Sequence, residues 1–126
     1  MHNQTYKAHS WSSIESCYKN LIESGWDQQP ILDLVRHIMN SELSKKLYAY
    51  TSLNTLVITI YEDIDRSTEC LHVEFDKSLN VWKFNYYGGN TYDSNTLNGK
   101  QPEFKRIYNR DNGIEKFDQF IKWIKW

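Results

Sequence analysis

The chain has 126 residues, with 15 lysines and arginines against 16 aspartates and glutamates, and 40% of its residues are hydrophobic. An aromatic content of 15% and a formal charge of -1 exclude an intrinsically disordered chain, which combines low hydrophobicity with high net charge. The same charge argues against general nucleic-acid binding, because displacing counterions from phosphates needs a basic surface. A chain of this length is expected to form one domain with its own core.

The first residues lack the apolar stretch of a signal peptide, and no run approaches the roughly 18 apolar residues of a membrane span. Cys17 and Cys70 lie in periodic segments, so we expect both to be buried as small hydrophobic side chains. The sequence therefore predicts a cytoplasmic protein without a cofactor.

The N-terminal part of the chain predicts two amphipathic helices. Residues 12–15 have the pattern of a capping box, in which Ser12 caps a helix that ends near Ser24, before Gly25. The second helix begins near Pro30, which the first turn of a helix tolerates. Its apolar positions are Ile31, Leu34, Val35, Ile38 and Met39. The short connection predicts an antiparallel helix pair.

The middle of the chain changes to β-branched and aromatic residues in alternation, which is typical of strands. Trp82, Phe84 and Tyr86 share one face of a strand, and we expect this face to be buried. Residues 88–103 are rich in Gly, Asn, Ser and Thr and predict a long polar loop. Strands are expected at residues 47–52, 55–61, 70–75, 81–87 and 104–108.

The chain closes with a helix that starts near Asn112 and Gly113. Its apolar series is Ile114, Phe117, Phe120, Ile121 and Ile124. The order of elements predicts a single α+β domain over residues 1–126, with residues 1–10 as a loose tail. In it, the N-terminal helix pair and the C-terminal helix cover one face of an antiparallel meander of four to five strands.

Two groups of residues could bind a metal or take part in catalysis, and both have simpler interpretations. Asp33 and His37 are four residues apart on a helix, which we interpret as a surface ion pair. Cys70, His72 and Glu74 point the same way from one strand, but the outer Cα atoms are about 13 Å apart, too far for one metal ion. A small enzyme or metal-binding protein that uses these three residues is the alternative function.

Two features favour binding to another protein. Carboxylates gather between the predicted strands that end at Tyr61 and begin at Cys70, either as a docking surface for a basic partner or as a solubilising turn. The polar loop carries tyrosines, which suit protein recognition but also occur in ordinary loops. The predicted partner-binding residues are Tyr61, Glu62, Asp63, Asp65, Glu69, Tyr86, Tyr87, Tyr92 and Asp93, and the acidic run continues to Glu74 and Asp76.

The predicted elements follow a fixed order: two amphipathic helices, a meander and a closing helix rich in Phe and Trp. Residues 12–15, 50–56 and 113–117 are among those that indicate this order. In this order the chain resembles the small immunity proteins of bacterial toxin systems, particularly those of contact-dependent growth inhibition. The resemblance is architectural and assigns no site residue. It implies a non-enzymatic cytoplasmic protein that binds one cognate toxin domain, commonly a nuclease, and blocks its active site, without direct contact with nucleic acid or membrane.

A third interpretation concerns nucleic acid. The last 27 residues hold seven basic and four acidic side chains, together with Tyr108, Trp123 and Trp126. Basic and aromatic side chains in one segment are typical of single-strand binding. The apolar face of the last helix favours docking on the core instead, and the sequence leaves the oligomeric state open.

Overall fold

A computed structural model describes residues 6–65, 68–88 and 103–126. It confirms the predicted α+β class, with helices near both ends of the chain and a five-stranded antiparallel sheet between them. None of the helices in the described part of the chain is long and apolar enough to cross a membrane. The helices are α1 (Trp11–Glu23), α2 (Gln29–Met39) and α3 (Gly113–Ile124), and the short 3-10 helices are η1 (Glu42–Lys45) and η2 (Arg110–Asn112).

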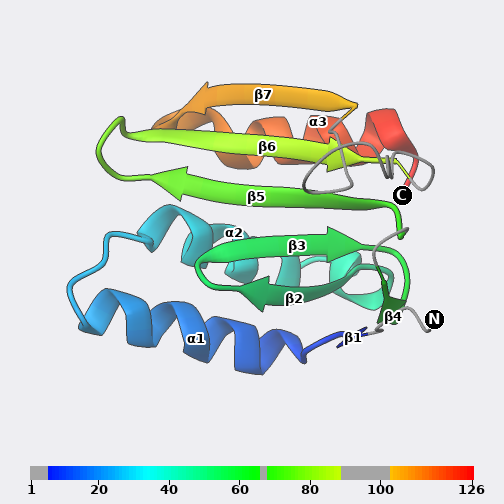
Figure 1. Cartoon of the computed structure of the whole chain (residues 1–126), viewed down its shortest axis with the longest axis horizontal. Coiled ribbons are helices and arrows are strands. Elements are labelled where there is room, and N and C mark those ends of the chain that lie inside the picture. The colour runs from blue at the N-terminus through cyan, green and yellow to red at the C-terminus, as the bar shows by residue number, and fades with distance from the viewer. Residues whose placement is uncertain (1–5, 66–67, 89–102) are drawn as a thin grey trace, which may run out of the picture.

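The main sheet is a meander in which the strands lie in the order β2, β3, β5, β6, β7 (Figure 1). A separate two-stranded ladder joins β1 to β4, because the chain leaves the main sheet after β3 and forms β4 before it returns as β5. The strands are β1 (Tyr6–Lys7), β2 (Tyr48–Ser52), β3 (Thr55–Thr59), β4 (Asp63–Ile64), β5 (Cys70–Asp76), β6 (Val81–Tyr87) and β7 (Phe104–Asn109).

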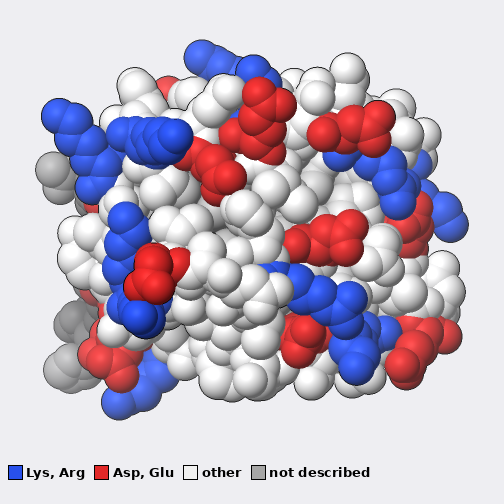
Figure 2. Space-filling model, turned by 180° about the vertical axis from the view of Figure 1, so that it is seen from behind, with Lys and Arg blue, Asp and Glu red and all other residues white. Residues whose placement is uncertain are grey.

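The helices form one layer on one face of the sheet. Figure 1 shows α2 and α3 behind the strands, and α1 packs against α2 and reaches β2. The predicted inward set is confirmed, since Trp82, Phe84 and Tyr86 are all buried, and Phe120 of α3 packs against the ring of Tyr86. The opposite face of the main sheet has no helix on it among the described residues. Figure 2 shows the helix side, where basic and acidic side chains are interspersed.

The start of α1 differs from the prediction. Ser10, not Ser12, is the N-cap, and its Oγ accepts a hydrogen bond from the Ser13 N–H at 3.1 Å. The backbone of Ser10 is extended, with φ -65° and ψ 149°, as an N-cap requires. The Glu15 carboxylate is bonded to Arg36 of α2, so it does not close a capping box. Gly25 follows the helix end at φ +98°, as predicted.

The loose N-terminal tail does not extend over residues 6–10. Tyr6 and Lys7 pair with β4, and the N–H of His9 donates to the carbonyl of Ala49 in β2 at 2.8 Å. Cys70 is buried as expected, whereas Cys17 is only half-buried, and the two are not disulfide-bonded. Of the predicted loop 88–103, the inner residues 89–102 lie outside the described residues.

Three local features of the turns matter for stability. The indole N–H of Trp82 donates to the carbonyl of Arg110 at 2.8 Å, and the indole ring lies against Gly113 at the start of α3. The Arg110 guanidinium binds the Asp27 carboxylate at 2.9 Å, which ties η2 to the segment before α2. In the β2–β3 turn, Leu53 has a φ of 57° and is 94% exposed.

Candidate functional site

The predicted acidic cluster begins where the chain leaves the sheet. We use the name acidic end for the surface formed by Tyr61, Glu62, Asp63, Asp65 and Glu69, which lies between the end of β3 and the start of β5. The first three side chains are exposed, and Tyr61 is 47% exposed. This surface lies at the end of the sheet that carries β4 (Figure 1).

The backbone of the acidic end is fixed by pairing and burial. In the β1–β4 ladder, Lys7 lies opposite Asp63 and Tyr6 lies opposite Ile64. The Ile64 side chain is 2% exposed, and the Ala8 N–H donates to the carbonyl of Glu62 at 3.0 Å. The exposed Glu62 and Asp63 side chains therefore project from a backbone that is held on both sides.

Asp65 and Glu69 are engaged within the protein. The Thr68 hydroxyl donates to Asp65 Oδ1 at 3.1 Å, and both residues are half-buried. The Glu69 carboxylate accepts a hydrogen bond from the hydroxyl of Tyr86, and the Glu69 carbonyl accepts one from the Thr59 hydroxyl at 2.7 Å. These two acids hold the turn and the start of β5 in place, and they offer less free charge to a partner than Glu62 and Asp63.

The two tyrosines at the end of β6 lie on opposite faces of the sheet. Tyr86 faces the core at 5% exposure, and burial, together with its bond to Glu69, raises its pKa above the usual value of 10. Tyr87 pairs with Cys70, and its ring centroid lies 4.7 Å from that of His72. Burial also raises the pKa of Tyr87. The structure therefore places both tyrosines next to the acidic end, but Tyr86 has little surface for a partner.

Among the remaining predicted residues, the two that the structure describes, Glu74 and Asp76, do not join this surface. Tyr92 and Asp93 lie outside the described residues. Glu74 and Asp76 lie toward the far end of the seven-residue strand β5, which spans about 20 Å. Asp76 binds Lys83 at 3.1 Å, and its bonds to the Ser78 hydroxyl and Lys83 lower its pKa to about 2. The acidic run in the sequence is thus divided between two ends of the sheet.

The alternative site on β5 does not assemble. Cys70, His72 and Glu74 share a face of the strand, as predicted, but Cys70 is buried and Glu74 accepts a hydrogen bond from Thr55 Oγ1 at 2.9 Å. Across the residues described here, no three His, Cys, Asp or Glu side chains are grouped so that they could hold a metal ion.

The predicted surface ion pair between Asp33 and His37 is wrong. His37 Nε2 instead lies 2.9 Å from Asp118 Oδ1, so this histidine joins α2 to α3. Asp33 accepts a hydrogen bond from the Gln29 amide at 2.8 Å. His37 pairs with Asp118, and not with Asp33 on its own helix, because α3 lies alongside α2.

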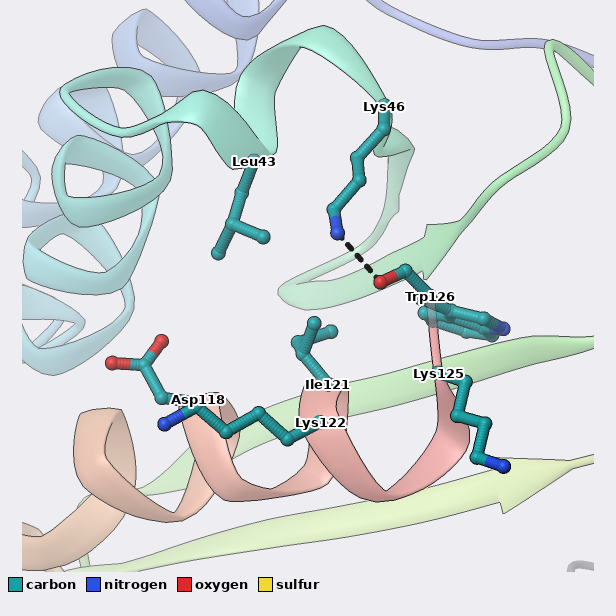
Figure 3. A pocket seen from close by; sticks show the side chains of 7 residues that line it. All are labelled: Leu43, Lys46, Asp118, Ile121, Lys122, Lys125 and Trp126. Atoms are coloured by element: carbon teal, nitrogen blue, oxygen red, sulfur yellow. Dashed lines mark hydrogen bonds between the residues drawn. The ribbon is translucent and has the colours of Figure 1, made fainter.

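A hollow of about 510 Å³ lies between η1 and the end of α3, with three lysines in its lining (Figure 3). The ammonium of Lys46 donates to the backbone oxygen of Trp126 at 2.6 Å. In Figure 3, Lys122 extends beneath Asp118 and Lys125 points away from the hollow. The three ammonium groups do not converge on one point, so the hollow does not form a site for a single anion.

Sequence reasoning missed the surface along β7. Ile107 is 66% exposed on this strand, and Trp123 of α3 is 61% exposed beside it. The basic residues nearby were visible in the sequence, and the predicted meander places its last strand at an edge, but the exposure of Ile107 and Trp123 beside that edge was not predicted. The exposed side chains along this strand are Lys105, Arg106, Ile107 and Asn109.

The described residues define a class of fold, an α+β domain with three helices on one face of an antiparallel meander. No family model, curated protein or solved structure matches the chain.

Proposed function

We propose that this chain is a non-enzymatic protein-binding module, an immunity protein that binds a cognate toxin domain through the acidic end and neutralises it. The observation that carries the proposal is the exposure of Tyr61, Glu62 and Asp63 on a backbone fixed by the β1–β4 ladder. A fixed backbone lowers the entropy lost when a partner binds.

The chemistry of the acidic end suits a basic partner. Nucleases bind the phosphates of their substrate with lysine and arginine, and carboxylates compete for the same side chains. Tyr61 adds a large side chain with few rotatable bonds, which is a frequent anchor in protein interfaces. A partner that places its basic substrate site on Glu62 and Asp63 could not bind nucleic acid at the same time.

The test compares two charge-reversed proteins. Glu62→Lys with Asp63→Lys changes the acidic end, and Glu42→Lys with Glu115→Lys makes the same charge change at exposed sites elsewhere. Each tagged protein is used to capture partners from its native cells, and the captured complex is identified by mass spectrometry and titrated with salt. We expect the wild type and the control to hold one basic toxin-like domain, and the acidic-end variant to bind it at least about tenfold more weakly.

Two outcomes would count against the proposal. Equal binding by both variants would remove the acidic end from the interface, and a complex that is insensitive to salt would remove the electrostatic argument. A cell assay adds the functional readout: expression of the wild type, but not of the acidic-end variant, should protect cells from the captured toxin.

A further inference from the structure

The two edges of the main sheet differ. At one edge, the N–H of His9 donates to the carbonyl of Ala49 in β2, so the N-terminal segment covers part of that strand. At the other edge, β7 pairs with β6 alone within the described part of the chain. Figure 1 shows β7 as the outermost strand, on the far side of the sheet from β2. The outer side of β7 therefore carries backbone groups that are free to bind an added strand.

Hollows flank β7 on both faces of the sheet. A hollow of about 310 Å³ lies on the helix side, between β7 and α3, and one of about 390 Å³ lies on the uncovered side, between β6 and β7. Arg106 lines both of them. An extended chain sends alternate side chains to opposite faces, so a strand added beside β7 would direct them toward these two hollows.

Each hollow has an exposed apolar residue. On the helix side, the Trp123 ring is stacked on Phe104, with the centroids 5.6 Å apart and the planes at 28°. Trp123 is 61% exposed in this position. On the uncovered side, Ile107 is 66% exposed. Apolar side chains of an added strand would cover both residues.

The charge along β7 is of one sign. Lys105, Arg106 and Lys116 make no ion pair with any other residue that the structure describes, in contrast to Lys83, which binds Asp76. The Arg106 guanidinium lies 4.4 Å from the centroid of the Phe104 ring, and the Lys116 ammonium lies 5.6 Å from that of Tyr108. These contacts hold the cations over aromatic faces and leave their charge available to an anion.

From these observations we infer that β7 accepts an extended acidic segment of a partner protein as a sixth strand of the sheet. Main-chain hydrogen bonds to β7 would give affinity, and alternate side chains would give specificity. Carboxylates of the segment would pair with Lys105, Arg106 and Lys116, while its apolar side chains would cover Trp123 and Ile107. This surface is separate from the acidic end and needs a partner of opposite charge.

Charge disfavours a second copy of the chain as the added strand. Antiparallel pairing of two β7 strands would gather four basic side chains, Lys105 and Arg106 of each copy, on one short two-stranded ribbon. Like charges on paired strands are destabilising, and lysine at a sheet edge is a common protection against self-association. An acidic strand removes this repulsion and replaces it with attraction.

A synthetic peptide tests the inference without knowledge of the natural partner. The probe is an eight-residue, fluorescein-labelled peptide with the sequence Ile-Ile-Glu-Glu repeated twice, which places apolar and acidic side chains on both faces of a strand. Binding is followed by fluorescence anisotropy, and the protection of the β7 amides by hydrogen exchange. We expect saturable binding to the wild type together with slower exchange of the amides of residues 104–109.

Matched variants separate the β7 surface from general electrostatics. The double variant Lys105→Glu with Arg106→Glu should bind the peptide at least about tenfold more weakly than the wild type. The control, Lys122→Glu with Lys125→Glu, makes the same charge change on the far side of α3. It should change the affinity for the peptide less than about twofold. The peptide with lysine in place of glutamate should bind the first variant and not the wild type. Trp123→Ala, at an exposed position, should also weaken peptide binding, and this second loss of affinity does not depend on charge.

Three results would overturn the inference. They are no binding to the wild type, equal weakening in both charge-reversed variants, and binding without protection of the β7 amides. A peptide N-methylated at alternate amides should fail to bind, because it cannot form the ladder on β7. If a single-stranded oligothymidylate binds this surface and the peptide does not, the surface serves nucleic acid and the inference is wrong.

Discussion

The indole ring of Trp82 occupies the space that a side chain on Gly113 would need. A methyl group built on Gly113 would overlap ring atoms of Trp82, which is 1% exposed and held by its bond to Arg110. Gly113→Ala should therefore lower the free energy of unfolding by about 2 kcal/mol, although alanine favours a helix. Urea denaturation followed by circular dichroism measures this change.

Two companion variants identify the cause of that loss. In a Trp82→Phe background, the smaller ring should reduce the cost of Gly113→Ala to below about 1 kcal/mol. Gly25→Ala is the contrast, because nothing lies within 4 Å of an added methyl group there. Gly25→Ala should lower the free energy of unfolding by about 1 kcal/mol, because alanine is strained at a φ of +98°. This loss should be the same in the wild-type and the Trp82→Phe backgrounds. A Gly113→Ala protein as stable as the wild type would show that the ring is free to move.

Leu53 holds an unfavourable backbone conformation at an exposed turn. Its φ of 57° is costly for a residue with a Cβ, and its side chain, 94% exposed, gains little from packing. Leu53→Gly should raise the free energy of unfolding by about 0.5 kcal/mol, because the relief of strain exceeds the added freedom of the unfolded chain.

The control for this change is Leu79→Gly in the β5–β6 turn. Leu79 is 65% exposed and does not have a positive φ, so glycine there relieves no strain. It should destabilise the protein by about 0.5 kcal/mol through the unfolded state. Thermal unfolding of the pair should move the melting temperature in opposite directions. A shift in the same direction would mean that side-chain contacts, not backbone conformation, decide both effects.

The ion pair between Asp27 and Arg110 should make stability depend on acid pH. The hydrogen bond from Arg110 lowers the pKa of Asp27 below its usual value of 3.8. A carboxylate with a lowered pKa contributes stability above its unfolded pKa and loses it as the pH falls through the folded pKa. At pH 7 the free energy of unfolding of the wild type should exceed that of Asp27→Asn by less than about 1 kcal/mol, because the ion pair is partly solvated. This difference in free energy should disappear as the pH falls below about 4.

A double-mutant cycle with Arg110→Gln assigns this pH dependence to the pair. The coupling between the two substitutions should be present at pH 7 and should decrease as the pH falls below about 4, when measured by urea denaturation at each pH. Coupling of the same size in strong acid would contradict the assignment to the ionised Asp27 carboxylate, since the contact of the Arg110 guanidinium with the Phe75 ring, 5.1 Å away, cancels in the cycle.

Tyr18 should make stability depend on alkaline pH. This buried tyrosine donates to the carbonyl of Asn54 at 3.1 Å, and burial raises its pKa above the usual value of 10. Because the folded state disfavours the ionised form, its stabilising effect is complete below pH 10 and is lost as the pH rises above that value. Tyr18→Phe should cost about 1 kcal/mol at pH 7, and the difference from wild type should shrink above about pH 10.

Tyrosinate absorbance provides the measurement for this prediction. Wild type should show a late ionisation step that coincides with unfolding, and Tyr18→Phe should reduce its amplitude. Tyr48→Phe is the control, at a position that is 36% exposed on β2, and it should leave that step in place. Ionisation of Tyr18 before unfolding would contradict its sealed environment.

Much of this fold could be predicted because its elements are periodic. The alternation of Trp82, Phe84 and Tyr86 identified the inner face of β6, and the positive φ of Gly25 was signalled by its place after a helix. The β1–β4 ladder could not be predicted, because two-residue strands have no periodicity. Its existence depends on Ile64 reaching the core, which is a matter of tertiary packing.

The candidate site was predicted less well, for a similar reason. A run of carboxylates in the sequence does not reveal which of them turn inward. Glu69 and Asp65 are bonded to Tyr86 and Thr68, whereas Glu62 and Asp63 are exposed. The predicted meander already placed its last strand at an edge, but the packing of α3 beside that strand, which leaves Trp123 exposed on the ring of Phe104, depends on tertiary contacts that no local pattern shows.

The β1–β4 ladder also has a consequence for the order of events during folding. The β2–β3 and β5–β6 hairpins are joined by short turns and can pair locally, whereas Tyr6 and Ile64 come from distant parts of the chain and must close a large loop. The acidic end is therefore expected to reach its final shape late, after the hairpins have formed. A nascent or partly unfolded chain would carry the same carboxylates without their arrangement, so recognition through this surface would select the fully folded protein.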